Sequence, residues 1–366
     1  MRHFIVLLFC FLQFTAIVDA QERVIDTKDK SPVAAASIFN AAGNMIGVTL
    51  NDGVIEGVPP SAYPITVRSI GYEQLVIEQP GNKAWEMTPK AYELEELVVV
   101  PVERNILKQT FYAREHFSMT CGNDTVTLFL EHMAHRFLPA SEEAKFSGSS
   151  SLRILCSRSY AHYRTASKDS VATDGEALFP SLLSIFDLNE EPITAPASFN
   201  KPGEEAKLYE KPGKSGMSLV LKQNAHTFIS TEDMLADSKK HSLSVWPLKL
   251  VGITFNMKQF YSTHTYGVND NGIYTPKDLI EAGFAMEADG GGKTMRKIFE
   301  EKEGGVVIRS MIELYVVGRD YLSKEEAKKE YKNKLADVEF IIPQTAPTLS
   351  EPTRKIVERA MAEKKK

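Results

Sequence analysis

The sequence predicts a mainly β protein, with an N-terminal seven-stranded β-sandwich followed by an α+β domain. The second domain is expected to contain a large antiparallel sheet, which could be strongly curved. Two observations carry this prediction. Over residues 22–100, apolar and polar residues alternate in short runs separated by turn-forming residues. Beyond residue 102 the apolar runs are longer, and only three short stretches carry helix-start signals.

Residues 1–20 have the pattern of a secretion signal peptide. Arg2 supplies the positive charge, residues 4–18 are almost wholly apolar, and Val18 and Ala20 are the small residues expected before a cut at Gln21. The apolar run is shorter than the roughly 20 residues of a spanning helix, so a membrane anchor is the less favoured alternative. We therefore expect export to the periplasm or an outer-membrane-associated location, with no transmembrane segment in the mature chain.

The N-terminal module, residues 21–101, is predicted to be a sandwich of short strands. In residues 65–70 apolar and polar positions alternate, as a strand with one buried face requires. Gly53 supplies the positive φ of a tight hairpin turn, and Gly71 marks a kink. The seven expected strands are 23–26, 33–39, 44–49, 54–58, 62–70, 72–78 and 94–100.

Five short motifs of this module, at 24–26, 32–37, 49–53, 67–72 and 94–100, carry a resemblance. On these motifs the module resembles the carboxypeptidase-regulatory-like domain, a transthyretin-like β-sandwich common at the front of Bacteroidota envelope proteins. Glu22 and Ile55 depart from the family pattern. The resemblance implies a packing or binding module and supplies no catalytic residues. The rest of the chain is too short for the receptor barrel that follows this module in some relatives.

Residues 102–340 are predicted to form an uncharacterised α+β domain. Segments 111–119 and 125–135 flank a turn at 121–124, which favours a hairpin of long strands over two helices. An internal break is expected at 189–216, where several prolines and glycines interrupt any regular element. Further strands are expected at 151–163, 217–223, 243–260, 262–266 and 305–317.

Three helices are signalled. Thr275 and Pro276 are typical of a helix start, and Gly283 of its end. Ser323 and Glu326 form a capping box for a charged helix to about residue 335. Residues 341–366 are expected to form a last helix, starting near Ser350, and a basic tail.

The net charge limits the class of partner, and the number of cysteines limits the possible disulfides. The net charge of −5 and the single basic cluster at 364–366 argue against a nucleic-acid partner. Cys121 and Cys156 remain after the signal peptide is removed, and in an oxidising compartment they could form a disulfide. A buried free thiol at Cys156 is the alternative, because it ends the apolar run 152–156.

No catalytic, cofactor-binding or metal-binding residues are predicted. The best metal candidate is the stretch 131–135, but on a strand His132 and His135 point to opposite faces and cannot share an ion. The spacings of zinc peptidases and the serine nucleophile elbow are absent. The Gly-Lys-Thr string at 292–294 lacks the first glycine of a phosphate loop, because Glu287 occupies that position.

Two triplets, at 124–126 and 169–171, resemble the O-glycosylation acceptor pattern of Bacteroidota envelope proteins. They make Thr125 and Ser170 candidate modification sites, with a plain turn or strand start as the alternative.

These observations predict a non-catalytic exported envelope protein that acts as a binding or scaffolding module for a peptide, glycan, lipid or membrane-protein partner. Two alternatives remain open. One is a periplasmic lipid or lipoprotein carrier, and the other is an enzyme of unrecognised type. The enzyme would need a cleft that collects acidic and histidine side chains such as Glu131, His132 and His162.

Overall fold

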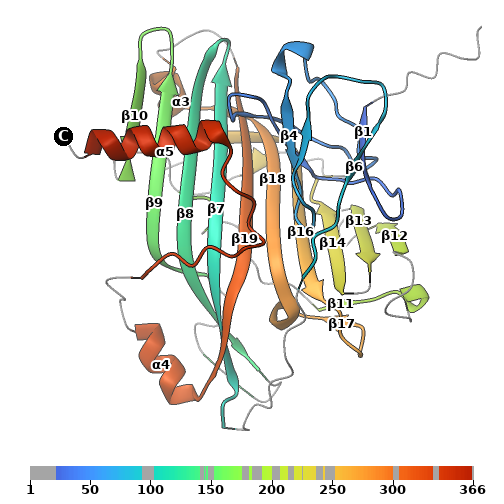
Figure 1. Ribbon diagram of the computed structural model, residues 1–366. Coiled ribbons are helices and arrows are strands. Elements are labelled where there is room, and N and C mark those ends of the chain that lie inside the picture. The colour runs from blue at the N-terminus through green and yellow to red at the C-terminus, as the bar shows by residue number, and fades with distance from the viewer. Residues whose placement is uncertain are drawn as a thin grey trace, which may run out of the picture.

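A large antiparallel sheet organises the protein, and a small β module packs against one of its faces (Figure 1). The structure is a computed structural model that describes residues 22–92, 103–140, 144, 146, 152–174, 181–183, 192–199, 207–212, 218–224, 226–235, 242–243, 252–299, 305–332 and 338–364. The predicted fold class is thus confirmed in its main features: mainly β, with a large antiparallel sheet.

The sheet has eleven strands in the order β10-β9-β8-β7-β19-β18-β16-β14-β13-β12, and β15 also pairs with β16. All of its pairings are antiparallel. Its strands are β7 (Ile106–Cys121), β8 (Asp124–Pro139), β9 (Arg153–Arg164), β10 (Asp169–Thr173), β12 (Lys207–Pro212), β13 (Ser218–Gln223), β14 (Thr227–Asp233), β15 (Ser242–Leu243), β16 (Thr254–Gly267), β18 (Leu279–Gly291) and β19 (Val306–Leu322). A separate short pair joins β11 (Ile193–Thr194) to β17 (Ile273–Tyr274).

The predicted hairpin of long strands is confirmed as β7 and β8, which pair from the turn at Cys121 and Asp124 to Ile106 and Pro139. The strands expected at 151–163, 217–223 and 305–317 correspond to β9, β13 and β19. Strand β12 lies inside the stretch expected as a break, and β14 and β18 are not among the predicted strands.

The helix expected from Thr275 to Gly283 is wrong. Thr275 does cap a turn, but the turn is a single 3₁₀ turn, η5 (Pro276–Asp278), and β18 begins at Leu279. The capping signal is local, and pairing with β16 and β19 decides the conformation beyond it.

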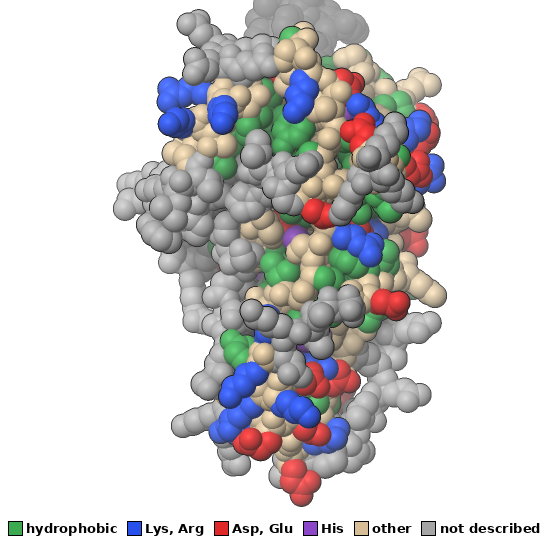
Figure 2. All heavy atoms as spheres, turned by 90° about the vertical axis from the view of Figure 1, so that its left-hand side faces the viewer, with side chains coloured by type: hydrophobic (Ala, Val, Ile, Leu, Met, Phe, Trp, Pro, Cys, Tyr) green, Lys and Arg blue, Asp and Glu red, His purple; other side chains and the backbone are tan. Residues whose placement is uncertain are grey.

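The two other predicted helices are present as α4 (Lys324–Lys332) and α5 (Glu351–Lys364), and α3 (Lys293–Ile298) is additional. Ser323 and Glu326 form the predicted capping box of α4. Ile356 and Ala360 of α5 pack on Phe129 and Tyr160 of the sheet. On the side of the molecule shown in Figure 2, acidic and basic side chains are interspersed, and i,i+3 and i,i+4 ion pairs follow α4 and α5. None of the described helices is long and apolar enough to cross a membrane.

The N-terminal module combines a parallel pair of strands with a four-stranded sheet of order β3-β2-β4-β5. Its elements are β1 (Arg23–Asp26), β2 (Ser37–Phe39), β3 (Met45–Val48), η1 (Pro60–Ala62), β4 (Ile65–Arg68), β5 (Leu75–Ile77) and β6 (Ala84–Met87). The seven-stranded sandwich is not confirmed. Residues 54–58 contribute only an isolated bridge at Val54, β6 was not predicted, and the strand expected at 94–100 lies outside the described residues.

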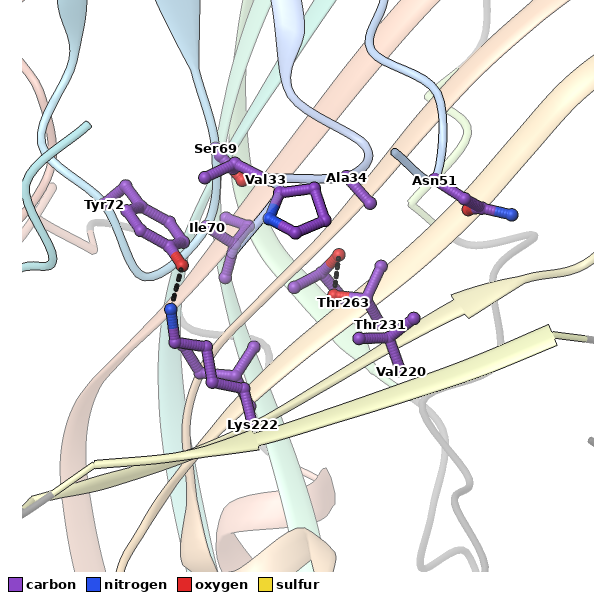
Figure 3. A pocket seen from close by; sticks show the side chains of 12 residues that line it. Val33, Ala34, Asn51, Ser69, Ile70, Tyr72, Val220, Lys222, Thr231 and Thr263 are labelled. Atoms are coloured by element: carbon purple, nitrogen blue, oxygen red, sulfur yellow. Dashed lines mark hydrogen bonds between the residues drawn. The ribbon is translucent and has the colours of Figure 1, made fainter. Parts of the chain in front are cut away.

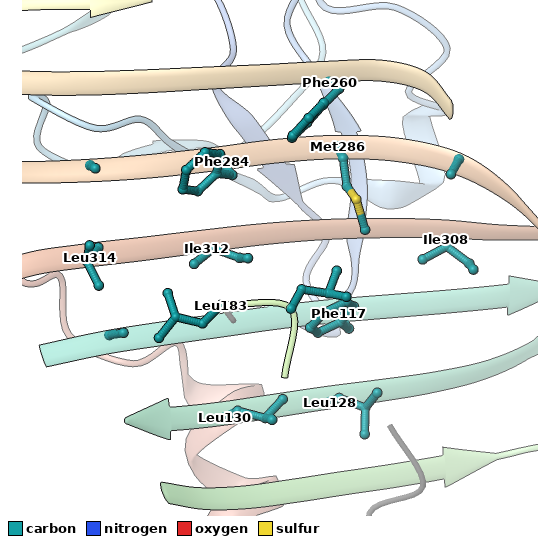
Figure 4. Close-up of a cluster of buried hydrophobic side chains, with 14 of the residues drawn as sticks. Phe117, Leu128, Leu130, Leu183, Phe260, Phe284, Met286, Ile308, Ile312 and Leu314 are labelled. Carbon is teal, nitrogen blue, oxygen red and sulfur yellow. The ribbon is translucent and has the colours of Figure 1, made fainter. Parts of the chain in front are cut away.

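Both faces of the large sheet are buried at its centre. One face, called the apolar face here, carries Phe117, Leu128, Phe284 and Ile312, and Leu183 lies over it (Figure 4). The opposite face, called the module face, contacts the module through a second apolar cluster that joins Ala35, Phe39, Met45 and Val48 of the module to Tyr261, Ala285 and Met311 of the sheet.

Gly283 allows the module to approach β18 closely. A Cβ atom at this position would lie 2.3 Å from Cγ1 of Ile70 in the module. We expect Gly283→Ala to lower the free energy of unfolding by about 1–3 kcal/mol, because overpacking forces the two layers apart. Gly305→Ala is the matched control, since a Cβ there would meet nothing within 4 Å.

The combination Gly283→Ala with Ile70→Ala should cost less than the sum of the two single changes, because the shorter side chain relieves the contact. Urea denaturation of the four proteins measures this coupling. Strictly additive losses would show that Ile70 and Gly283 do not set the spacing of the layers.

Candidate ligand pocket

Charged side chains are buried where the module meets the sheet. Arg68 of β4 reaches across to Glu313 of β19, and its Nη1 lies 3.2 Å from Nε2 of His116 in β7. Side-chain exposure is only 7% for Arg68 and 2% for Glu313. Glu313 also accepts a hydrogen bond from the Tyr315 hydroxyl at 3.0 Å. An unpaired charge is costly to bury, so Arg68 and Glu313 are stable in this interior only while they are paired. Their pairing therefore favours contact between the module and the sheet.

The protonation states follow from burial and the surrounding charges. Burial lowers the pKa of His116 to about 3, and the positive charge of Arg68 acts in the same direction, so the ring is neutral at neutral pH. Burial would raise the pKa of Glu313, but the positive charges of Arg68, Arg114 and Lys90 outweigh it and lower the pKa. Since Arg68 donates to Nε2 of His116, we assign the ring proton to Nδ1.

Two lysines form three further ion pairs across the same interface. Lys90 Nζ lies 3.0 Å from Glu281 of β18. Lys222 of β13 contacts Asp26 and lies 3.1 Å from Asp29, both in the module. Figure 3 shows Lys222 extending from the sheet toward the hydroxyl of Tyr72, 3.1 Å away, beside a small cavity of about 30 Å³. This cavity holds about one water molecule and is too small for a ligand.

A larger pocket of about 330 Å³ lies at the other end of the interface. This junction pocket is bounded by the face of the module sheet that carries Thr66 and Arg68, by His116 of β7 and by residues 348–353, which run into the first turn of α5. Its volume falls within the range of roughly 300–1,000 Å³ typical of small-molecule sites, which often form where domains meet. The lining residues are Phe39, Asn40, Ala41, Gly43, Pro64, Thr66, Arg68, Gln74, Val76, His116, Thr348, Leu349, Ser350, Glu351, Pro352 and Thr353.

The residues suggested for an enzyme do not come together. Glu131 accepts a hydrogen bond from Tyr112 on the module face. His132 lies on the apolar face, with Nε2 2.7 Å from Glu115 and Nδ1 2.7 Å from the hydroxyl of Ser157. His162 pairs with Asp169 near α5. This candidate site is therefore not assembled.

The histidines of β8 behave as predicted. Because residues 124–139 form a strand, His132 and His135 point to opposite faces of the sheet. His135 stacks edge-on against Phe137. Among the residues that the structure describes, no group of three or more histidine, cysteine or acidic side chains could hold a metal ion.

The disulfide considered between Cys121 and Cys156 is not formed, and both thiols are free. Cys121 lies at the β7–β8 turn opposite Asp124, whereas Cys156 pairs with Met133, nine positions along β8 from that residue. At about 3.4 Å per residue this separates the two cysteines by roughly 30 Å along the sheet. A disulfide needs Cα atoms within about 7 Å.

The two candidate glycosylation sites lie at one end of the sheet. Thr125 is the second residue of β8 and lies opposite Arg164 of β9, and Ser170 lies in β10 opposite Tyr163. Both side chains are half-buried in the folded chain. Modification of either residue stays a prediction.

Sequence reasoning missed Arg68, His116 and Glu313. A signal was present, because His116 and Glu313 each interrupt a predicted strand made largely of apolar residues. A charged residue in such a run points to a buried partner, but it does not say which one.

Comparisons with known proteins add little to this geometry. No family model matches the chain, and no curated protein matches it. One solved structure that matches, "Lipid-protein interactions in lipovitellin", has 11% sequence identity and a TM-score of 0.26, over 60% of this chain and 26% of that chain. This chain thus spans about a quarter of the length of that one, and a likeness of this size supports no conclusion about fold or function.

Proposed function

We propose that this protein is a non-catalytic, exported envelope protein that binds a ligand in the junction pocket. The observation that carries the proposal is the place of this pocket, between the module, the sheet and the segment before α5. Export and the carboxypeptidase-regulatory-like character of the module rest on the sequence and are part of the proposal.

The ion pairs of the interface support binding by a preformed site. Arg68 with Glu313, Lys90 with Glu281, and Lys222 with Asp26 each join the module to a different strand of the sheet. A module held at three places keeps the pocket walls in position before a ligand arrives. Such preorganisation reduces the ordering cost of binding.

Filling the pocket should weaken binding while leaving the fold intact. Val76 of β5 is 48% exposed and lines the pocket, so Val76→Trp places an indole inside it. A strand position accepts an aromatic residue readily. Ile273→Trp is the matched control, because Ile273 is a 43% exposed strand residue outside the pocket lining.

Calorimetric titration with a panel of neutral sugars, short peptides and fatty acids tests this prediction. We expect at least one class to bind the wild type and Ile273→Trp equally, and to bind Val76→Trp at least about tenfold more weakly, a difference of about 1.4 kcal/mol. Equal binding by all three proteins would place the site elsewhere.

The apolar face favours a second candidate function, that of a lipid carrier. A continuous apolar cluster runs across β8, β7, β19, β18 and β16 on this face. A lipid there would have to displace Leu182 and Leu183, whose segment is held by the Leu182 N–H and the Ser181 hydroxyl donating to Glu115. Lipid that co-purifies with the protein, detected by mass spectrometry in wild type and Val76→Trp alike, would favour this function over the first.

A further inference from the structure

The charged groups of the junction pocket are already paired within the protein. The charge of Arg68 is balanced by Glu313, although the buried Nε of Arg68 has no hydrogen-bond partner among the described residues. Glu351, on the first turn of α5, lies 2.6 Å from Lys355 one turn later. His116 is neutral at neutral pH, because burial lowers its pKa to about 3. The pocket therefore offers a ligand no unpaired charge among these residues.

Neutral hydrogen-bonding groups remain open around the same pocket. No described residue makes a hydrogen bond to the side chains of Thr66, Gln74 or Thr348, and all three line the pocket. The Nδ1–H assigned to His116 likewise has no acceptor among the described residues. Together these side chains supply both donors and acceptors, and a ligand that matches them must carry both kinds of group.

The hydroxyls nearest α5 are engaged in capping. The Oγ of Ser350 accepts from the Thr353 N–H at 3.4 Å and lies 2.9 Å from the Thr353 hydroxyl. These two residues shape the wall of the pocket, and the open groups lie on β4, at Gln74 just before β5, on β7 and at residue 348. A ligand would therefore be bound between the module sheet and the segment before α5.

Apolar side chains lie among these polar groups. Val76, Pro64 and Leu349 line the pocket together with Phe39, and Val76 is 48% exposed. A sugar ring has hydroxyls around its edge and C–H groups on its faces, so it can use both kinds of surface. The volume of 330 Å³ corresponds to about eleven water molecules at roughly 30 Å³ each, which is room for one or two sugar rings.

We propose that the junction pocket binds a neutral saccharide unit, an inference that rests on the proposed function and specifies its ligand. An anionic ligand would lack an unpaired cation, and a fatty acid would leave the amide of Gln74 and the hydroxyls of Thr66 and Thr348 without partners. A peptide also carries donors and acceptors. Strand β5 is an edge of the module sheet and pairs there only with β4, so a neutral tripeptide is one of the probes in the test.

The test titrates the full mature chain with four probes at millimolar concentration: neutral hexoses and their disaccharides, glucuronate, a neutral tripeptide and decanoate. We expect only the neutral sugars to bind, with dissociation constants on the order of 1 mM or below. Gln74→Ala and Thr348→Ala should each weaken sugar binding about five- to tenfold, as expected for the loss of one hydrogen bond. Thr194→Ala, at an exposed threonine outside the pocket lining, should leave binding unchanged.

Each other outcome overturns the saccharide inference alone or both proposals. If the tripeptide, glucuronate or decanoate binds and Val76→Trp blocks it while the sugars do not bind, the saccharide inference is wrong and the binding function stands. Sugar binding that is unchanged in Gln74→Ala, Thr348→Ala and Val76→Trp would place the sugar outside the pocket and overturn the inference. If no probe binds the wild type, both proposals fail.

Discussion

Arg68→Met is expected to lower the free energy of unfolding by about 3–5 kcal/mol, because it leaves the carboxylate of Glu313 buried without its partner. Glu313→Leu should cost a similar amount, since it leaves Arg68 uncompensated in the same place. The double variant should be considerably more stable than either single variant, because an apolar pair of similar volume needs no desolvation of charge. Urea denaturation of the four proteins, with the slope checked for two-state behaviour, measures the coupling.

The exposed ion pair between Lys30 and Glu86 is the matched control. Its nitrogen and oxygen lie 2.8 Å apart, but the side chains are 56% and 48% exposed. We expect Glu86→Gln to change stability by less than about 1 kcal/mol, as exposed pairs usually do. Single variants of Arg68 and Glu313 that behave like Glu86→Gln would mean that the module is not held by the buried pair.

The β7–β8 hairpin was predictable because the residues that determine it are adjacent in the sequence. Two long runs with strand character flank a turn whose Gly122 adopts a φ of +59°. Strand β18 was not predictable in the same way. Its residues are buried on both the apolar face and the module face, so the alternation that identifies a strand is obscured. The capping residues just before it gave a stronger local signal for a helix.

The junction pocket could not be predicted, because its parts are distant in sequence. Arg68 and Glu313 are 245 residues apart, and the pocket adds residues 348–353. Polar residues within apolar runs indicate that buried polar groups need partners, but they do not identify the partners. Only the packing of the module on the sheet shows which residues pair and what space remains between them.

The burial of the neutral His116 ring is expected to lower the free energy of unfolding in mild acid. His116 has a pKa near 6.5 in the unfolded chain and about 3 in the folded protein. Between these values the unfolded state binds more protons, so the contribution of His116 is fully present above pH 6.5 and is lost as the pH falls toward 3. From pH 7 to pH 5 the loss amounts to about 2 kcal/mol, at 1.36 kcal/mol per pKa unit. The groups that face the ring are Arg68, Glu313 and Arg114.

His116→Gln removes the titrating ring but keeps an acceptor for Arg68, so its stability should fall less steeply between pH 7 and pH 5. His226→Gln is the control, because His226 lies on the surface. Part of the pH dependence should persist in His116→Gln, since burial also lowers the pKa of His135, to about 4. The urea midpoints of wild type, His116→Gln and His226→Gln at pH 7, 6 and 5 measure this difference in pH dependence. If wild type and His116→Gln lose stability in parallel, His116 is not buried as a neutral ring, and the module does not seal the face of β7 on which it lies.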